Sequence, residues 1–287
     1  MPKTNINQVC GLSSDSAIEL LAWPVGSKAE LKSIKNEVIA LQTTRFTPEQ
    51  NSLAGASPAK PFVENNQSVY HSFNLGLHVD DNVQTVSNNR DYLQNFLQSK
   101  LTNKVSIQWL EQVHGSEVVE VTRDTNQTLI ADASITREKH IALAIMTADC
   151  LPILLCDTNR TIVAAIHGGW RPLAAGIIKN TLAKMRVDID NIQAWLGPCI
   201  GNRAFEVGDD VKLAFIKQNV CFEKAFSSHK KGKYLADLHA IATQQLTDLG
   251  ITKISSLAEC TYSRSDKYYS YRRESITGRM ATIICLS

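Results

Sequence analysis

Residues 141–178 constrain the fold and the chemistry more than any other stretch of this 287-residue chain. Three short apolar runs within it are rich in Ile, Val and Leu and are separated by turn residues: 141–146, 151–155 and 161–166. Such runs predict buried strands. Thr147–Cys150 separates the first two runs and His167–Trp170 follows the third, so an acid, a thiol and an imidazole come where strands are expected to end. The stretch therefore predicts a functional site.

A glycine pair directly after the third run favours a sharp turn into a helix. Gly168 and Gly169 permit tight backbone geometry, and Pro172 suits the first turn of a helix over 173–185. The N-terminus of a helix offers unpaired backbone amides and a partial positive charge to an anion. Arg171 adds a full charge at the same place. We therefore expect a phosphate group to bind at this turn.

The overall composition is that of an ordinary globular protein and argues against several classes. Hydrophobic residues make up 44% of the chain and charged residues 20%. The net charge of +2 does not indicate a nucleic-acid-binding surface, and no apolar run reaches the roughly 18 residues that span a bilayer. Seven cysteines without regular spacing, together with a polar start at 1–16, indicate a reducing cytoplasmic location rather than a disulfide framework.

The predicted strands and helices mix without a regular βαβ rhythm, which favours an α+β fold. Residues 1–37 are expected to form an N-terminal extension with a first strand, and residues 38–287 one compact domain. Within that domain the segment 46–72, with three prolines and little periodicity, predicts a long loop or lid. The other expected elements are strands at 38–45, 105–112 and 192–196, helices at 83–98 and 210–218, a helix ending at Gly250, and a C-terminal hairpin whose last strand is 280–286.

His114, Cys150 and His167 are the residues whose types and positions best fit a metal site. Each lies at an expected strand end, and both histidines are followed by glycine. Two imidazoles and one thiolate form a normal ligand set for catalytic zinc, which keeps its fourth position open. Cys156 is not expected to join them, because an extended strand over 150–156 would hold the two sulfur atoms roughly 20 Å apart.

The same residues leave other interpretations open. Cys150 could be a small core residue and the histidines structural, or it could be the nucleophile of a Cys–His hydrolase in which Asp149 or His114 orients the base. Two histidines and a cysteine also suit a blue-copper centre. The P-loop and G-x-G-x-x-G patterns do not occur in the chain, so the nucleotide-binding folds that carry them are not indicated.

Arginine side chains are the candidates for binding an anionic or polyhydroxyl ligand, because the planar guanidinium fits phosphate. These candidates are Arg45, Arg171 and the pair Arg272–Arg273. Tyr271 precedes that pair in a tyrosine-rich segment, and its aromatic face is suited to stacking on a base.

Nine motifs follow one another along the chain: TTR (43–45), NLGLHVDDN (74–82), QVHGSEV (112–118), ADAS-x-T (131–136), MTADCLPILLC (146–156), AAIHGGWRPLAAGI (164–177), WLGPCIG (195–201), FEVGDDV (205–211) and YSYRRE-x-x-TGRMA (269–281). Together they resemble the YfiH-like family over about residues 38–287. Members of that family are known as multicopper polyphenol oxidase or laccase-domain proteins and are described as purine nucleoside phosphorylases. The chain departs from the family pattern where Phe46-Thr47-Pro48 follow Arg45 and where Asp80 stands in a glycine position.

The resemblance implies a single layered α-β-β-α sandwich domain and a zinc ion held by His114, Cys150 and His167. These three residues and Asp149 are the expected catalytic residues. It implies phosphorolysis of adenosine, inosine and methylthioadenosine, with adenosine deamination as a further activity. Purine nucleoside and phosphate are then the expected partners of a monomer or homodimer. The expected substrate- and phosphate-binding residues are Arg45, Asn74, Gln112, Arg171, Tyr271 and Arg273.

The leading hypothesis is therefore a zinc-dependent purine nucleoside phosphorylase. A copper-dependent polyphenol oxidase is the runner-up, although seven histidines are few for the trinuclear cluster that a multicopper oxidase needs. A non-enzymatic zinc domain is the third hypothesis. Structural zinc is normally closed by four protein ligands, and the sequence offers no convincing fourth ligand near these three.

Overall fold

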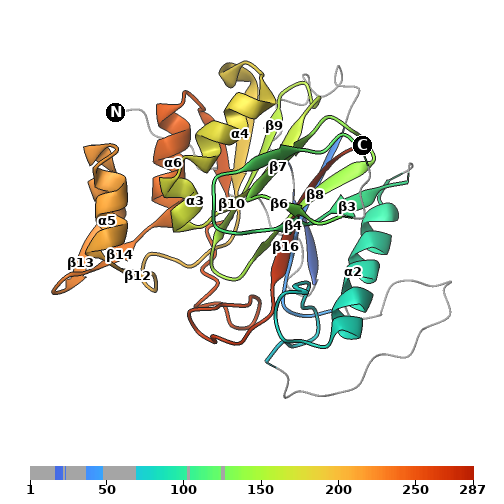
Figure 1. The fold of residues 1–287 in the computed structure, drawn as a ribbon, viewed down its shortest axis with the longest axis horizontal. Helices are drawn as coiled ribbons and strands as arrows, with labels where there is room; N and C mark the ends of the chain where they lie inside the picture. The colour runs from blue at the N-terminus through green and yellow to red at the C-terminus, as the bar shows by residue number, and fades with distance from the viewer. Residues whose placement is uncertain (1–16, 22, 24–36, 48–68, 102–103, 124–126) are drawn as a thin grey trace.

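The computed structural model describes residues 17–21, 23, 37–47, 69–101, 104–123 and 127–287. Two β-sheets packed face to face form its centre (Figure 1). The first sheet has five strands in the spatial order β1 (Ile18–Leu21), β2 (Val38–Thr43), β16 (Met280–Leu286), β8 (Ile141–Thr147) and β3 (Ser106–Gln108). Its neighbouring strands are antiparallel except for β3 and β8, which are parallel.

The second sheet has six strands in the spatial order β15 (Lys253–Ser256), β11 (Ile192–Leu196), β9 (Leu151–Asp157), β10 (Val163–Gly168), β7 (Ala133–Thr136) and β5 (Val118–Glu120). The outer pairs, β15 with β11 and β7 with β5, are parallel, and the pairs between them are antiparallel. Two small sheets complete the strands: β12 (Glu206–Gly208) with β14 (Lys233–Ala236) and β13 (Phe226–Lys230), and β4 (Leu110–Glu111) with β6 (Leu129–Ile130).

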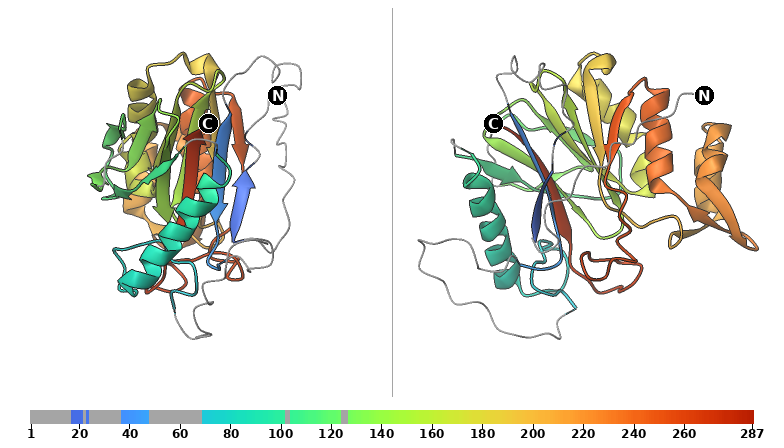
Figure 2. Two further views of the ribbon diagram at one scale, coloured as in Figure 1. Left: turned by 90° about the vertical axis from the view of Figure 1, so that its right-hand side faces the viewer. Right: turned by 180° about the vertical axis from the view of Figure 1, so that it is seen from behind.

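Helices cover the outer face of each large sheet. One helix, α2 (Val83–Gln98), packs on the first sheet through Leu93 and Leu97. The second sheet is covered by α3 (Trp170–Ala174), α4 (Ile177–Met185) and α6 (Leu238–Asp248), and α5 (Asp209–Ile216) packs beside them on the small sheet of β12 and β14. In Figure 1 α3 and α6 lie to the left of the two large sheets and α2 to the right, and the rear view in Figure 2 shows the same order reversed. The predicted α+β class and α-β-β-α layering are confirmed.

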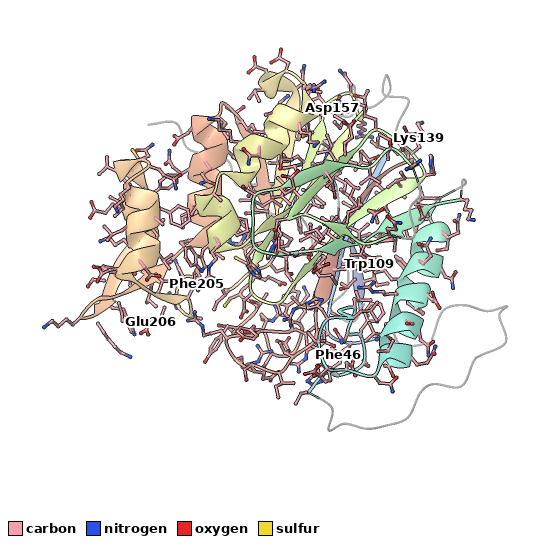
Figure 3. All side chains as sticks on the ribbon, viewed as in Figure 1. Phe46, Trp109, Lys139, Asp157, Phe205 and Glu206 are labelled. Carbon is pink, nitrogen blue, oxygen red and sulfur yellow. The ribbon has the colours of Figure 1, made fainter. Side chains whose placement is uncertain are left out.

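The continuous apolar runs of the sequence follow from this layering, because both faces of the central strands are covered. On β9, Ile153 and Leu155 face the helices while Leu154 and Cys156 face the other sheet. A strand buried on both sides needs no polar alternation. Side chains fill the spaces between the layers throughout (Figure 3).

The segment between β8 and β9 crosses from one sheet to the other. β8 belongs to the five-stranded sheet, and β9, which begins after three intervening residues, belongs to the six-stranded one. Asp149 makes this passage with a φ of 94°, in a region that residues with a side chain seldom adopt. The crossing places Cys150 at the edge where the two sheets meet.

Several sequence predictions are confirmed and others are wrong. The strands at 141–147, 151–157, 163–168, 192–196 and 280–286 are present, as is the helix at 83–98, whose first turn is capped by the Asn82 side chain. The expected strand 105–112 is wrong, because it divides at Trp109 into β3 and β4, which belong to different sheets. The expected C-terminal hairpin is also wrong, because β16 pairs with β2 and β8 instead.

Two helix predictions need correction. The helix expected over 173–185 is divided into α3 and α4 by Gly176, whose φ of 81° interrupts the helical backbone. The helix expected over 210–218 is α5, which begins one residue earlier, at Asp209, and ends two residues earlier, at Ile216. The expected lid at 46–72 and the extension at 1–37 fall mostly outside the described residues. None of the described helices has both the length and the apolar character needed to cross a membrane.

Candidate metal centre

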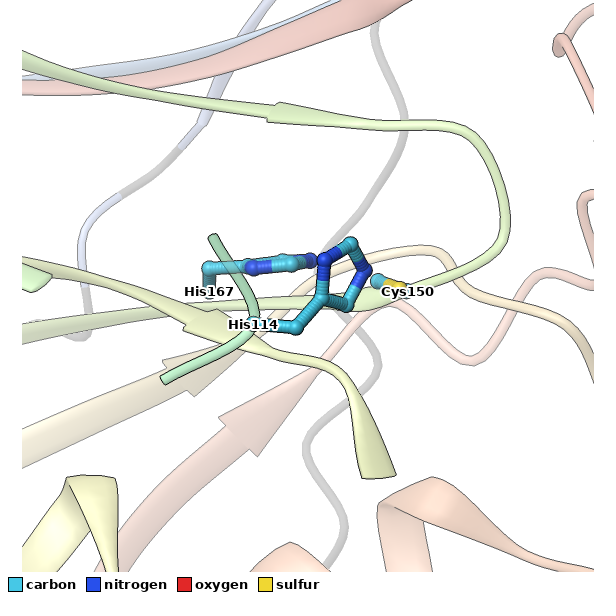
Figure 4. A group of neighbouring side chains, drawn as sticks. All are labelled: His114, Cys150 and His167. Atoms are coloured by element: carbon cyan, nitrogen blue, oxygen red, sulfur yellow. The ribbon is translucent and has the colours of Figure 1, made fainter. Parts of the chain in front are cut away.

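His114, Cys150 and His167 come from three separate segments and point toward one another (Figure 4). His114 follows β4, Cys150 ends the crossing before β9, and His167 lies near the end of β10. Their ligand atoms all lie within 4.8 Å of one another. The two imidazole rings stand nearly perpendicular, with their centroids 4.7 Å apart. His167 is buried, Cys150 is partly exposed and His114 is exposed, so the cluster opens to solvent on one side.

The buried carboxylate of Asp132 organises two of these segments at once. Its Oδ1 lies 2.7 Å from Nδ1 of His167, and this contact directs Nε2 of the ring toward the cluster. The same carboxylate accepts hydrogen bonds from the backbone amides of Val113, His114 and Gly115, at 3.2, 3.0 and 2.6 Å. The turn that carries His114 is therefore built on the group that orients His167. A carboxylate on the remote nitrogen of a metal-binding histidine is a common supporting arrangement.

Gly169 leaves the space in which the three side chains meet. A Cβ atom at this position would lie 3.2 Å from Sγ of Cys150 and 3.5 Å from ring atoms of both His114 and His167. A side chain here would therefore enter the cluster. The φ of Gly169 is −62°, which any residue can adopt. Glycine at this position is therefore explained by the space that the cluster needs and not by the backbone conformation.

Asp149 positions Cys150 through the protein backbone. Its carboxylate accepts hydrogen bonds from the Thr261 hydroxyl at 2.7 Å and from the Arg272 amide at 2.6 Å. Its carbonyl oxygen accepts a third from the amide of Ile200 at 2.9 Å. Both carboxylate oxygens are thus engaged, and Asp149 stabilises the unusual backbone geometry that aims the next residue into the cluster.

The electrostatics of the cluster favour a thiolate. Burial on its own raises the pKa of Cys150, but the neighbouring His167 and His114 outweigh it and lower the pKa to about 6. Burial lowers the pKa of His167, but Cys150 and Asp132 outweigh it and raise the pKa to about 9. Both shifts favour the charged forms, a thiolate on Cys150 and a protonated imidazole on His167. The site supplies the negative charge that a bound cation requires.

Four of the six expected substrate residues use their polar atoms within the protein. The Gln112 carboxamide exchanges two hydrogen bonds with the Met146 backbone. Asn74 accepts from the amides of Gly76 and Arg279 and donates to Asp81. Arg45 is buried, donates to the carbonyl of Ser265 and pairs with Glu274, and Arg273 donates to the carbonyls of Thr261, Tyr262 and Tyr268. These four residues hold together the loops beside the cluster.

The other two expected residues are exposed. Tyr271 has 57% of its surface exposed. Arg171 is exposed as well, and its guanidinium carbon lies 4.5 Å from the centroid of the Trp170 ring, which holds the charge near the surface. Arg171 follows His167 by four positions, so the two residues are close in sequence.

Sequence reasoning missed three residues of the site: Asp132, Gly169 in its spacing role, and Arg279. Arg279 is half-buried; burial lowers the pKa of its guanidinium, and the opposing charges of Cys150 and Asp149 raise it, so this cation lies within electrostatic reach of the cluster. Asp132 and Arg279 both occur in motifs that the sequence displays, ADAS at 131–134 and TGRMA at 277–281. Their acidic and basic side chains inside otherwise small or apolar motifs were the available signal.

The donor set fits a single metal ion. Two imidazole nitrogens and one thiolate sulfur suit zinc or copper, and the open side leaves a position for a ligand from solution. Cys156 takes no part, because it points into the space between the sheets. No fourth protein ligand joins the group within the part of the chain that the structure describes.

The fold and this cluster define a class: α-β-β-α sandwich proteins with a His–Cys–His site for one metal ion at the meeting edge of two sheets. The family described as multi-copper polyphenol oxidoreductase laccase matches residues 64–287, and the chain belongs to this family. The predicted YfiH-like resemblance is confirmed.

Individual relatives agree with this assignment. The chain is 44% identical over 217 residues to the purine nucleoside phosphorylase YfiH of Shigella flexneri, covering 76% of this chain and 87% of the relative. A purine nucleoside phosphorylase of Pseudomonas aeruginosa is 43% identical over 221 residues, covering 77% and 88%. The crystal structure of a DUF152-family protein from Neisseria meningitidis superposes with a TM-score of 0.78 at 36% identity, covering 95% of this chain and all of that one.

Proposed function

We propose that the protein is a zinc-dependent purine nucleoside phosphorylase. It would cleave adenosine, inosine or methylthioadenosine with phosphate to the free base and the corresponding ribose 1-phosphate, and would also deaminate adenosine. The observation that carries the proposal is the convergence of His114, Cys150 and His167 on one open metal position. The names of the Shigella and Pseudomonas relatives support the reaction class.

His114, Cys150 and His167 would hold the ion, which supplies a Lewis acid and charge stabilisation when bound. The chain's own residues prepare the site. Asp132 fixes the tautomer of His167, because a carboxylate at Nδ1 requires a proton there and leaves Nε2 free as a ligand. Asp149 fixes the position of Cys150. The open side of the cluster admits the nucleoside.

Arg171 is the phosphate-binding residue in this proposal. Its charge is exposed and held against Trp170 next to the turn that carries His167. A guanidinium fork binds phosphate oxygens in a bidentate manner. Tyr271 would stack its exposed ring on the purine. Arg279 adds a second positive charge within electrostatic reach of Cys150 and Asp149. Arg45, Asn74, Gln112 and Arg273 would act by holding the surrounding loops in place.

The test is product identification with and without phosphate. The zinc-loaded protein is incubated with adenosine, and the products are separated by chromatography. Adenine and ribose 1-phosphate that form only with phosphate support phosphorolysis, whereas inosine without added phosphate reports deamination. Cys150→Ala should abolish metal binding and both reactions. Cys156→Ala, a buried cysteine outside the cluster, is the matched control and should keep them. Unchanged adenosine in every reaction would refute the proposal.

A copper-dependent polyphenol oxidase is the second candidate, favoured by the description of the family. A multicopper oxidase needs a trinuclear cluster in addition to a mononuclear site. The described residues contain one group of three or more potential ligands, the His–Cys–His cluster. Metal analysis joined to a visible spectrum separates the candidates: zinc without colour supports the phosphorylase, and an intense thiolate-to-copper band with phenol oxidation supports the oxidase.

A further inference from the structure

A second group of sulfur and imidazole side chains lies outside the metal centre. Cys199, Cys260 and His239 line one pocket of about 180 Å³. Cys199 follows β11 and is buried, Cys260 follows β15 and is partly exposed, and His239 lies in the first turn of α6. The metal centre and the proposed phosphorylase reaction use none of the three.

The backbone holds the two cysteines side by side. Cys199 and Cys260 are direct partners in an isolated parallel β-bridge. The bridge consists of the Cys199 amide donating to the Glu259 carbonyl at 3.3 Å and the Thr261 amide donating to the Cys199 carbonyl at 3.0 Å. Neighbouring strands lie roughly 4.8 Å apart, and disulfides join Cα atoms about 4.4–6.8 Å apart. The backbone therefore already has the spacing that a disulfide requires.

Cys260 is the reactive member of the pair. Its sulfur accepts a hydrogen bond from the Gly201 amide at 3.2 Å. Burial raises the pKa of this thiol, but hydrogen bonds from the Ser263 side chain and from the amides of Gly201, Ser263 and Tyr262 outweigh it and lower the pKa below its ordinary value. A partly exposed thiol whose pKa is lowered by amide donors ionises more readily than an ordinary cysteine, and its thiolate is a nucleophile open to solution.

Cys199 has the opposite properties and a base beside it. Burial raises the pKa of its thiol, so this residue stays protonated. Its sulfur lies 3.5 Å from Nδ1 of His239, whose Nε2 lies 2.9 Å from the Gly197 carbonyl oxygen. A carbonyl oxygen only accepts, so Nε2 carries the ring proton and Nδ1 is free to accept the proton of the Cys199 thiol.

We propose that Cys260 and Cys199 form a hydroperoxide-reactive thiol pair that closes into a disulfide, with His239 as the base for Cys199. The Cys260 thiolate attacks a peroxide oxygen; the S–O bond forms, the O–O bond breaks, and the leaving alkoxide takes a proton and departs as an alcohol, or as water from hydrogen peroxide. The Cys199 sulfur then attacks the Cys260 sulfur while His239 takes the thiol proton in the same step. The S–S bond forms, the S–O bond breaks, and hydroxide takes that proton and leaves as water. Two thiols are oxidised and one peroxide is reduced.

The disulfide would form next to the support of the metal centre. The residues that follow the two cysteines, Ile200 and Thr261, both donate to Asp149. The Ile200 amide donates to the Asp149 carbonyl at 2.9 Å, and the Thr261 hydroxyl donates to the Asp149 carboxylate at 2.7 Å. Asp149 directly precedes Cys150. The oxidation state of the pair thus acts on the two contacts that aim this metal ligand.

Peptide mapping of the full-length protein tests the proposal. The protein is treated with stepwise amounts of hydrogen peroxide in excess zinc, which protects Cys150, then alkylated under denaturing conditions and digested without reduction. We expect a peptide linking residues 199 and 260 that dithiothreitol releases. Cys221, an exposed cysteine elsewhere in the fold, provides the control: Cys221→Ser should form the same link, and Cys260 should react about tenfold faster than Cys221.

Single variants assign the roles. Cys199→Ser should stop the reaction at a sulfenic acid on Cys260, which dimedone captures. Cys260→Ser should leave Cys199 unoxidised and alkylated. Alkylation of both cysteines in the oxidised wild-type protein would overturn the proposal, as would a link from Cys260 to any other cysteine. Because the readout is a peptide mass, its failure is separate from any failure of the phosphorylase reaction.

Discussion

The Asp132 carboxylate lies 2.7 Å from Nδ1 of His167 and also accepts the backbone amides that shape the turn of His114. One buried side chain therefore orients one ligand and positions a second. Burial raises the pKa of Asp132, and hydrogen bonds from His167 and Gly115 outweigh it and lower the pKa, so the group is a carboxylate at neutral pH. The arrangement requires a carboxylate, because both Asp132 oxygens accept hydrogen bonds.

Replacing Asp132 with Asn should lower metal affinity roughly tenfold to a hundredfold. An amide offers only one accepting atom, so its NH2 group must face either His167 or the amides of the His114 turn. Competition with a chromophoric chelator measures the affinity. Asp157→Asn is the control, because Asp157 is a buried carboxylate that accepts the amides of Thr161 and Ile162 at the other end of β9 (Figure 3). It should reduce stability and leave metal affinity intact; equal losses of affinity in both variants would contradict this role.

Gly169→Ala should give a folded protein whose metal affinity is at least about tenfold lower, since the added Cβ would stand 3.2 Å from the Cys150 sulfur. Metal content after dialysis and the thermal midpoint provide the two measurements. Gly176→Ala is the matched control: its φ of 81° is strained for alanine, but nothing lies within 4 Å of the new atom. That variant should lose about 1 kcal/mol of stability with normal metal content. Normal metal content in Gly169→Ala would show that the cluster tolerates the methyl group.

Arg171→Gln should raise the KM for phosphate about tenfold, which corresponds to the loss of a charge-assisted hydrogen bond. The KM for the nucleoside should stay unchanged. Lys179→Gln removes the same charge from an exposed position on α4 and should leave both constants unchanged. An unaltered phosphate KM in Arg171→Gln would place phosphate elsewhere, with Arg279 as the next residue to replace.

Glu259→Gln should lower the free energy of unfolding at neutral pH. It should also reduce the dependence of that free energy on pH in the acid range. The Glu259 carboxylate accepts from Lys267 at 2.7 Å, from Tyr268 at 2.5 Å and from Arg264 at 2.9 Å. Burial raises its pKa, but the hydrogen bonds from Lys267 and Tyr268 outweigh it and lower the pKa. The stabilisation is therefore complete above the unfolded-state pKa of about 4.3 and is lost as pH falls through the lower folded-state pKa.

Urea unfolding at pH 7 and at pH 3 measures this effect. The wild-type protein should exceed Glu259→Gln by about 2 kcal/mol at pH 7, and the difference should shrink at pH 3. Glu223→Gln is the control, because the Glu223 carboxylate is exposed and its ion pair with Lys212 is long, at 3.7 Å. This variant should match the wild type at both pH values. A difference that grows on acidification would reverse the assigned sign.

The apolar runs of the sequence were sufficient to predict the central strands, because β8, β9 and β10 are buried on both faces and need hydrophobic residues throughout. They were not sufficient to assign β8 and β9 to different sheets, because pairing partners are remote in sequence. The same limit explains Trp109, where alternation continues although the strand leaves its sheet.

The three members of the His–Cys–His cluster could be named from residue type and strand ends, whereas Asp132 could not. Its role exists only through contacts with residues 17 to 19 positions earlier and 35 positions later. The arginine candidates show that residue type alone does not say which partners a side chain has in the folded chain. Arg273 carries the right donors for phosphate, but three backbone carbonyls already occupy them in the folded chain.

The passage of the chain from β8 to β9 has a mechanical consequence for the metal centre. Cys150 sits on the link between the two sheets, while His167 belongs to only one of them. If one sheet slid over the other, the Cys150 thiolate would move away from the His167 imidazole. The dissociation rate of a bound ion therefore depends on how tightly the two sheets pack against each other. Replacing Leu154 or Trp195, which lie between the sheets, with a smaller residue should then increase the dissociation rate of the ion.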